Sequence, residues 1–164
     1  MISSLEVKTF LMQKLKIKKK YSKDEFDLYQ FFLKTTRIHP DNVIFVPPYI
    51  FFFVKSENYF EAKRLLKKIR TKLINKKVLI IKSESTLIRL LFSLFPDTYI
   101  HDIIVDIKNG TRLITILFYF FEDRGIAIGR NGTYIKIINR IFDEYVYLEN
   151  YNTPIEIKCD AINL

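Results

Sequence analysis

The sequence predicts an α+β protein made of two successive small modules. The chain has 164 residues, of which 49% are hydrophobic, so it can bury a core and is too apolar for a disordered tail. Helical patterns alternate with short strand patterns along most of its length. The order of these patterns over residues 21–82 returns over residues 83–160, which indicates an internal repeat of a whole module.

The first module is expected to open with a capped helix. Ser22 and Glu25 have the spacing of a capping box, in which each side chain binds the backbone N–H of the other residue. The apolar spacing that follows predicts a helix ending near Arg37. Two strands should come next, over residues 43–46 and 49–54, because the proline pair between them favours a turn and cannot donate to a strand ladder.

A basic helix and a third strand are expected to close the first module. The helix should cover residues 57–73, with apolar side chains on one side and cations largely on the other. The strand should cover residues 77–81. The cations of the helix are Lys63, Arg64, Lys67, Lys68, Arg70 and Lys72.

The second module begins in the same way. Ser85 is the expected N-cap of a short helix that Pro96 ends. Strands are expected over residues 100–107 and 111–121, because the Asn-Gly pair between them is the strongest short-range hairpin signal in the chain.

A Gly-x-x-Gly loop at residues 129–132 interrupts the helical part of the second module. A helix should precede it, another should cover residues 133–142, and a strand over 153–159 should follow. The two glycines allow a tight reversal and a close approach to phosphates, while Arg130 and Asn131 offer amide hydrogens, a cation and an amide side chain. Four such residues alone also occur in ordinary turns, so the repeated module around them is the stronger indication.

The order helix, strand, strand, helix, Gly-x-x-Gly, helix, strand is that of a type II KH module, which clamps about four unpaired nucleotides. We therefore expect tandem type II KH-like modules, with the first one degenerate. The candidate RNA-binding residues are Gly129, Arg130, Asn131, Gly132, Ile126, Ile128, Tyr134, Lys136, Lys63 and Lys67. Ile126 and Ile128 fit either an apolar groove for bases or the core, and Tyr134 offers a stacking ring.

The second module resembles a known family. The string from Glu122 to Gly132, preceded by 82–88 and a turn at 92–96, is similar to the last KH module of NusA-type transcription factors, particularly the short archaeal form with two KH modules. The resemblance covers most of residues 21–160 and implies a protein that holds single-stranded nascent RNA near RNA polymerase. It further implies a role in elongation, through pausing, termination or antitermination.

One departure from the family concerns the first module. The family has a glycine loop between the second strand and the long helix, whereas residues 54–60 of this chain contain no glycine. The resemblance therefore implies a first module without the usual phosphate clamp. A KH-fold ribosomal or ribosome-assembly protein bound to rRNA remains the alternative.

The charge of the chain favours an anionic partner. The net charge is +9, which suits RNA, DNA or an acidic membrane surface. Residues 1–77 hold 18 Lys/Arg and 7 Asp/Glu, whereas residues 78–164 hold 9 and 11. The positive charge is thus concentrated away from the glycine loop, and we expect the 63–72 helix face to contact RNA or to have become a protein-docking surface.

Several classes of function are not expected. One cysteine and two histidines give neither a disulfide nor a clustered metal site, and no Gly-x-Ser-x-Gly motif surrounds a serine, so we expect no cofactor and no enzyme. The longest apolar run, residues 113–121, is too short to span a membrane. Residues 1–20 are expected to form a basic arm or helix, although an organelle transit peptide is the alternative. The expected location is the cytoplasm of an archaeal-like cell, or an organelle matrix or stroma.

Overall fold

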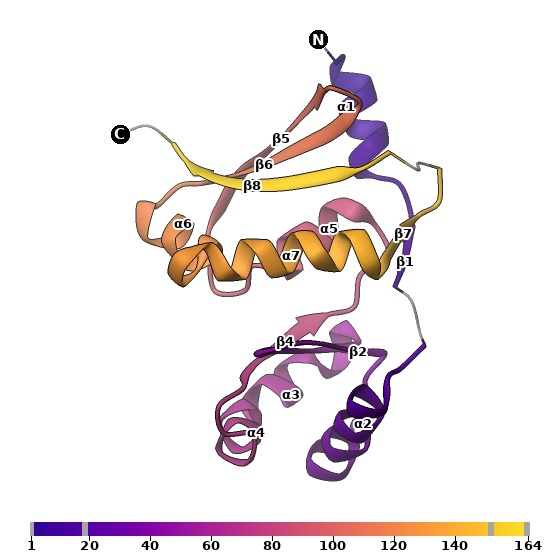
Figure 1. Ribbon diagram of the computed structural model, residues 1–164, viewed down its shortest axis with the longest axis vertical. Coiled ribbons are helices and arrows are strands. Elements are labelled where there is room, and N and C mark those ends of the chain that lie inside the picture. Colours follow the sequence, from indigo (N-terminus) through magenta and orange to yellow (C-terminus); the bar gives the residue numbers. More distant parts are fainter. Residues whose placement is uncertain (1, 18–19, 151–152, 163–164) are drawn as a thin grey trace. The chain divides into compact units, whose positions relative to one another are not determined.

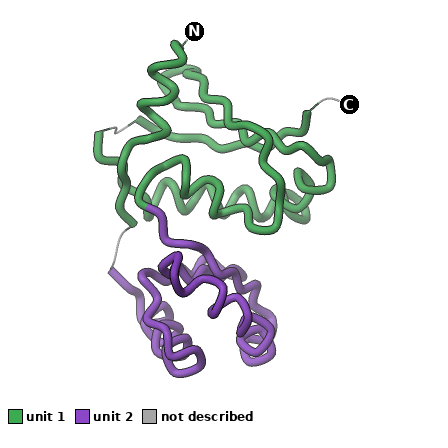
Figure 2. The backbone as a smooth tube through the Cα atoms, turned by 180° about the vertical axis from the view of Figure 1, so that it is seen from behind, with its two compact units in different colours: residues 1–18, 85–164 green, residues 19–84 purple. Residues whose placement is uncertain are grey.

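The computed structural model describes residues 2–17, 20–150 and 153–162, and it shows an α+β protein, as predicted (Figure 1). The chain divides into two compact units, which Figure 2 shows in different colours. Unit 1 consists of residues 1–18 and 85–164, and unit 2 consists of residues 19–84.

Unit 2 is one three-stranded sheet with its helices on one side (Figure 1). Its elements are α2 (Lys23–Thr36), β2 (Asn42–Val46), β3 (Tyr49–Val54), the 3-10 helix η1 (Ser56–Asn58), α3 (Tyr59–Arg64), α4 (Leu66–Lys72) and β4 (Lys77–Lys82). The strand order is β2-β3-β4, with β2 antiparallel and β4 parallel to β3. The predicted turn at the proline pair joins β2 to β3.

The core of unit 2 lies between the sheet and the helices. Alternate residues of β3, namely Ile50, Phe52 and Val54, point into it, as the period of two in a strand requires. Phe32 of α2 stacks on Phe52 with ring centroids 4.4 Å apart, and neither side chain is exposed. Each side chain of this size stabilises the fold by roughly 1.5–3 kcal/mol when it is buried.

The predicted capping box at the start of α2 is present and does more than cap the helix. Ser22 N donates to Glu25 Oε1 at 3.0 Å, and Glu25 N donates to Ser22 Oγ at 3.1 Å. The second carboxylate oxygen of Glu25 accepts a hydrogen bond from Phe45 N at 2.9 Å. Glu25 is buried, so this one side chain fixes α2 against the outer edge of β2.

The prediction of one continuous helix over 57–73 is wrong. The helical region is broken at Leu65, whose backbone angles of φ −91° and ψ 1° end α3 before α4 begins. Neither glycine nor proline marks the break, and the apolar spacing continues across it, so the sequence pattern could not show it.

Unit 1 has a second three-stranded sheet, with α5, α6 and α7 on one side of it (Figure 1). Its elements are α1 (Ser4–Leu11), β1 (Leu15–Ile17), α5 (Leu87–Ser93), β5 (Ile100–Lys108), β6 (Thr111–Phe118), α6 (Phe121–Ile128), the 3-10 helix η2 (Arg130–Gly132), α7 (Thr133–Glu144), β7 (Val146–Leu148) and β8 (Ile155–Ala161). The strand order is β5-β6-β8, with β5 antiparallel and β8 parallel to β6.

The two units share one topology. In each, a helix precedes an antiparallel strand pair, two helices follow, and the last strand joins the sheet parallel to the middle one. This is the repeat that the sequence predicts, and it is compatible with the type II KH order. The predicted hairpin is also present, with Asn109 at φ 51° and Gly110 at φ 76°, as a primed turn requires.

The N-terminal segment is not the separate arm that the 1–20 boundary predicts. A helix does form there, but it belongs to unit 1, because Phe10 is fully buried and β1 pairs antiparallel with β7. Leu15 N also donates to Ser85 O at 3.0 Å. The many lysines of this segment made it look like a solvent-exposed arm. Lys8, Lys14 and Lys16 are indeed exposed, although Phe10 between them is buried. Lys18 and Lys19 lie outside the described residues.

Two element boundaries in unit 1 also differ from the prediction. Thr86 rather than Ser85 occupies the N-cap of α5, without a capping side-chain bond. β6 ends at Phe118 and α6 begins at Phe121, whereas the predicted strand ran to residue 121, because the aromatic side chains at 119–121 favour a strand. Within the described residues, no helix is long and apolar enough to cross a membrane.

Replacing Glu25 with alanine should destabilise the protein by about 2–3 kcal/mol, because Phe45 N loses a charged acceptor and the helix loses half of its capping box. Urea denaturation followed by circular dichroism measures the change. Glu6→Ala is the matched control, because Glu6 forms the same capping box with Ser3 at the exposed start of α1. It should cost clearly less than Glu25→Ala, because the Glu6 carboxylate is fully exposed. Equal losses in the two variants would contradict the role of the Phe45 bond.

Candidate nucleic-acid interface

The glycine loop reverses the chain between α6 and α7 through left-handed backbone angles. Gly129 has φ 78° and ψ 171°, Asn131 has φ 56°, and Gly132 has φ 71°. Gly132 N donates to Gly129 O at 3.1 Å, and Thr133 Oγ1 donates to Arg130 O at 2.6 Å. These two bonds brace the loop backbone, because each joins residues within the turn.

Gly129 is required by a close contact as well as by its angles. A Cβ atom on Gly129 would lie 2.8 Å from Tyr134 Cβ and 2.9 Å from Tyr134 N. These distances leave no room for any side chain. At Gly132 a Cβ atom would meet only Lys136 Cε, at 3.9 Å, so the constraint there is the positive φ alone.

Tyr134 anchors the loop instead of stacking on a base. Its hydroxyl donates to Leu94 O at the end of α5, and its ring packs edge-on against Phe95 at 5.9 Å between centroids. The side chain is only 6% exposed. The prediction of Tyr134 as an RNA-stacking residue is therefore wrong, since a buried ring offers no free face.

The other residues predicted around the loop are accessible. Arg130, Asn131 and Lys136 are exposed, and the aliphatic part of Lys136 lies beside Gly132. Ile126 is 61% exposed on α6, which removes it from the core, whereas Ile128 is half-buried. The structure thus brings cations and an apolar side chain to the same end of α6.

The start of α7 adds a second source of positive potential. The N-cap is Gly132, which has no side chain that could bind the first N–H groups of the helix. α7 has 12 residues, and the N-terminus of such a helix carries a partial positive charge of roughly half a unit. Together with Arg130 and Lys136, this geometry suits an anion such as a phosphate.

Asn139, which the sequence gives no reason to select, ties α7 to the last strand. Its amide nitrogen donates to Ile135 O at 3.0 Å and to Ile157 O at 2.9 Å, and its oxygen accepts from Ile157 N at 2.7 Å. The outer edge of β8 is therefore bound to the helix at this point. These hydrogen bonds fix α7 against β8.

In unit 2 the position of the glycine loop is occupied by the junction of α3 and α4 at Leu65. Residues 54–60, where the sequence comparison looked for a glycine loop, instead form the end of β3, η1 and the start of α3. Lys63 is half-buried with its Nζ 5.6 Å from the Tyr59 ring, and Lys67 is exposed. Arg64 binds both carboxylate oxygens of Glu61, at 2.8 and 2.7 Å.

Cys159 is poorly suited to nucleophilic chemistry. Burial raises the pKa of the Cys159 thiol to about 12, against a smaller lowering by Arg124. The thiol therefore stays protonated at neutral pH, and only the thiolate is an effective nucleophile.

Comparison with known proteins places the fold alone. No protein-family model and no curated protein matches the chain. Among solved structures, one described as "Crystal structure of APE1850" matches with a TM-score of 0.61 and 21% sequence identity, over 85% of this chain and 99% of that one. The matched share is larger than either unit, so the likeness extends over residues of both.

Three glycine-to-alanine variants should separate the two constraints on the loop. Gly129→Ala should cost about 3 kcal/mol or more, from the contact with Tyr134 and the left-handed angles. Gly132→Ala should cost about 1–2 kcal/mol from its angles alone. Gly125→Ala, in the open on α6, should stabilise the protein by about 0.5–1 kcal/mol. Urea denaturation measures all three, and a different order would refute the geometry described for the loop.

Proposed function

We propose that this chain is an RNA-binding transcription factor resembling the NusA type, which holds single-stranded nascent RNA near RNA polymerase and so modulates pausing, termination or antitermination. The observation that carries the proposal is the rigid, exposed glycine loop between α6 and α7, with two cations beside it. The duplicated topology of the two units supports it further.

The contact requires binding and no chemical step. Phosphates would lie over residues 129–132, where the loop backbone, the start of α7 and the side chains of Arg130 and Lys136 all favour negative charge. Bases would lie against the apolar surface that Ile126 and Ile128 provide on α6. Because the backbone makes much of the contact, the loop itself reads the sugar-phosphate chain rather than a base sequence.

Most of the positive charge of the chain lies in unit 2. Residues 19–84 contain 15 Lys/Arg and 7 Asp/Glu, a net charge of +8, whereas residues 1–18 and 85–164 together contain 12 and 11, a net charge of +1. Unit 2 therefore supplies most of the attraction for a polyanion, and its Lys63 and Lys67 flank the junction that replaces the glycine loop. Unit 1 supplies the glycine loop, whose backbone would contact the phosphates.

Replacing Arg130 and Asn131 with aspartate should weaken binding of a fluorescein-labelled 12-nucleotide single-stranded RNA at least about tenfold, because two carboxylates would face the phosphates. Fluorescence anisotropy measures the affinity. Both side chains are exposed, so the fold should persist, and circular dichroism checks it. In single-round transcription with the polymerase of the source organism, the wild-type chain should change pause duration and the variant should not.

A matched control carries the same change of charge elsewhere on unit 1. Lys158→Asp with Thr153→Asp alters two exposed residues that lie away from the loop, and it should leave RNA binding within about twofold. Equal loss in both variants would reduce the interface to net charge and refute the clamp. Crosslinking to a single rRNA site, with no effect on transcription, would instead favour a KH-fold ribosomal or ribosome-assembly protein.

The contribution of unit 2 is measurable from salt dependence. If Lys63 and Lys67 neutralise two phosphates, Lys63→Ala with Lys67→Ala should reduce the slope of log K against log salt concentration by about 1.4, because each contact to a single strand contributes about 0.7. Lys34→Ala, an exposed lysine on α2, is the control and should leave the slope unchanged. An unaltered slope in the double variant would show that Lys63 and Lys67 contact solvent and not RNA phosphates.

A further inference from the structure

Unit 1 exposes a group of aromatic rings where β5 begins, β6 ends and α6 begins. We call Tyr99, His101, Tyr119 and Phe120 the aromatic cluster. The ring centroids of Tyr119 and Phe120 are 5.0 Å apart, and Tyr119 lies 6.0 Å from both Tyr99 and His101. Tyr99 is 60% exposed, Tyr119 41% and Phe120 49%, so these rings gather on the surface rather than in the core.

Two phenylalanines stand exposed at the start of α6, and the Phe121 ring lies 5.7 Å from the Arg124 guanidinium. Phe120 occupies the N-cap of α6 and makes no capping bond, and Phe121 follows it with 69% of its surface exposed. Ser3 and Ser22 cap α1 and α2 with side-chain bonds, whereas α3, α4, α5 and α7, like α6, begin without one. A serine in the same position would satisfy an N–H group of α6, so two exposed phenylalanines there favour a binding role.

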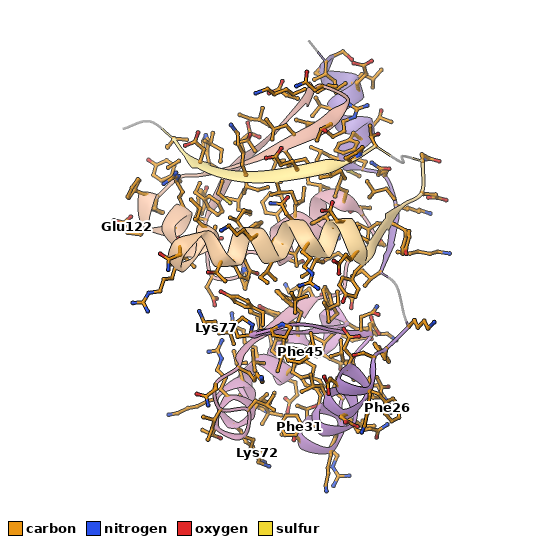
Figure 3. The ribbon with its side chains drawn as sticks, in the orientation of Figure 1. Phe26, Phe31, Phe45, Lys72, Lys77 and Glu122 are labelled. Atoms are coloured by element: carbon orange, nitrogen blue, oxygen red, sulfur yellow. The ribbon has the colours of Figure 1, made fainter. Side chains whose placement is uncertain are left out.

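The charges around the aromatic cluster are mainly negative. Glu122 and Asp123 form the first turn of α6, and Asp123 Oδ2 accepts a hydrogen bond from Tyr99 N at 2.9 Å. Glu122 lies at the outer end of this helix in Figure 3. On the sheet, Asp102 and Asp160 lie in one row across β5, β6 and β8, and Arg124 approaches Asp160 to 4.0 Å. Glu122 and Asp123 thus place two carboxylates at the start of α6, and Asp102 follows His101 directly in the sequence, in a chain whose net charge is +9.

We propose that the aromatic cluster and its carboxylates form a docking surface for a basic peptide segment of a partner protein. Arginine side chains of such a segment would stack on the exposed rings, and their charges would be balanced by Glu122, Asp123 and Asp102. Nucleic acid is disfavoured here, because its phosphates would lie beside carboxylates. The surface uses none of the residues assigned to RNA, so the inference is independent of the proposed function.

A double variant removes the rings without endangering the helix. Tyr119→Ser with Phe120→Ser deletes two members of the aromatic cluster and places serine at the N-cap of α6, so the melting temperature should stay the same or rise. The probes are two fluorescein-labelled 12-residue peptides with identical apolar positions, one with arginine and one with glutamate at the remaining positions. Fluorescence anisotropy gives their affinities.

The wild-type chain should bind the arginine peptide and not the glutamate peptide. The double variant should bind the arginine peptide at least about tenfold more weakly, as expected for the loss of two interface aromatic anchors. Phe26→Ser is the matched control, because Phe26 is a 52% exposed aromatic side chain on α2 in unit 2, and it should leave the affinity unchanged (Figure 3). Glu122→Lys removes a negative charge but no aromatic ring, and it should also weaken binding of the arginine peptide.

Measurements with RNA separate this proposal from the previous one. The Tyr119/Phe120 variant should bind single-stranded RNA as the wild type does, and the Arg130/Asn131 variant should bind the arginine peptide as the wild type does. Undiminished peptide binding in the Tyr119/Phe120 variant, equal binding of both peptides by the wild type, or an equal loss of RNA and peptide affinity would each overturn the docking surface.

Discussion

The close contact between Gly129 and Tyr134 is the constraint on which the candidate interface depends. Because the Tyr134 backbone lies where a side chain on residue 129 would be, only glycine allows α7 to start this near to the end of α6. Tyr134 in turn binds Leu94 O and packs on Phe95, so the loop is attached to α5 through one buried side chain. The exposed residues Arg130 and Asn131 can face a ligand in a fixed geometry because the residues beneath them are not free to move.

The two units have the same topology, but only unit 1 has the close contact between Gly129 and Tyr134. In unit 2 the two helices meet at Leu65, with no glycine and no left-handed residue at the junction, so the backbone has no comparable exposed reversal. What remains there is side-chain charge, as at Lys63 and Lys67. A contact made by flexible lysines is longer in range and less demanding in geometry than one made by a fixed backbone. The unit without the glycine loop is also the unit that carries most of the positive charge.

Local features of the fold were predictable from the sequence, whereas tertiary ones were not. The capping box at Ser22 and the Asn109 hairpin each depend on a few neighbouring residues, and both are present. The break at Leu65 and the burial of Phe10 depend on residues far away in the sequence, which periodicity does not report. In the candidate site, the loop and its cations were recognisable from residue type. The anchoring role of Tyr134 was not, because an aromatic residue beside a binding loop fits a stacking ring and a buried anchor equally well.

Helix α6 connects two surfaces of opposite character. Its first turn carries Glu122 and Asp123 beside the aromatic cluster, and its last residues lead into the cationic glycine loop. Eight residues of α-helix span about 12 Å, which is slightly more than the screening length of about 8–10 Å at physiological salt. Charges at one end are therefore largely screened from the other, while the helix holds both ends in a fixed relation. If both proposals hold, such an arrangement would let a polyanion and a polycation bind the same small unit without competing, which a uniformly basic surface would not allow.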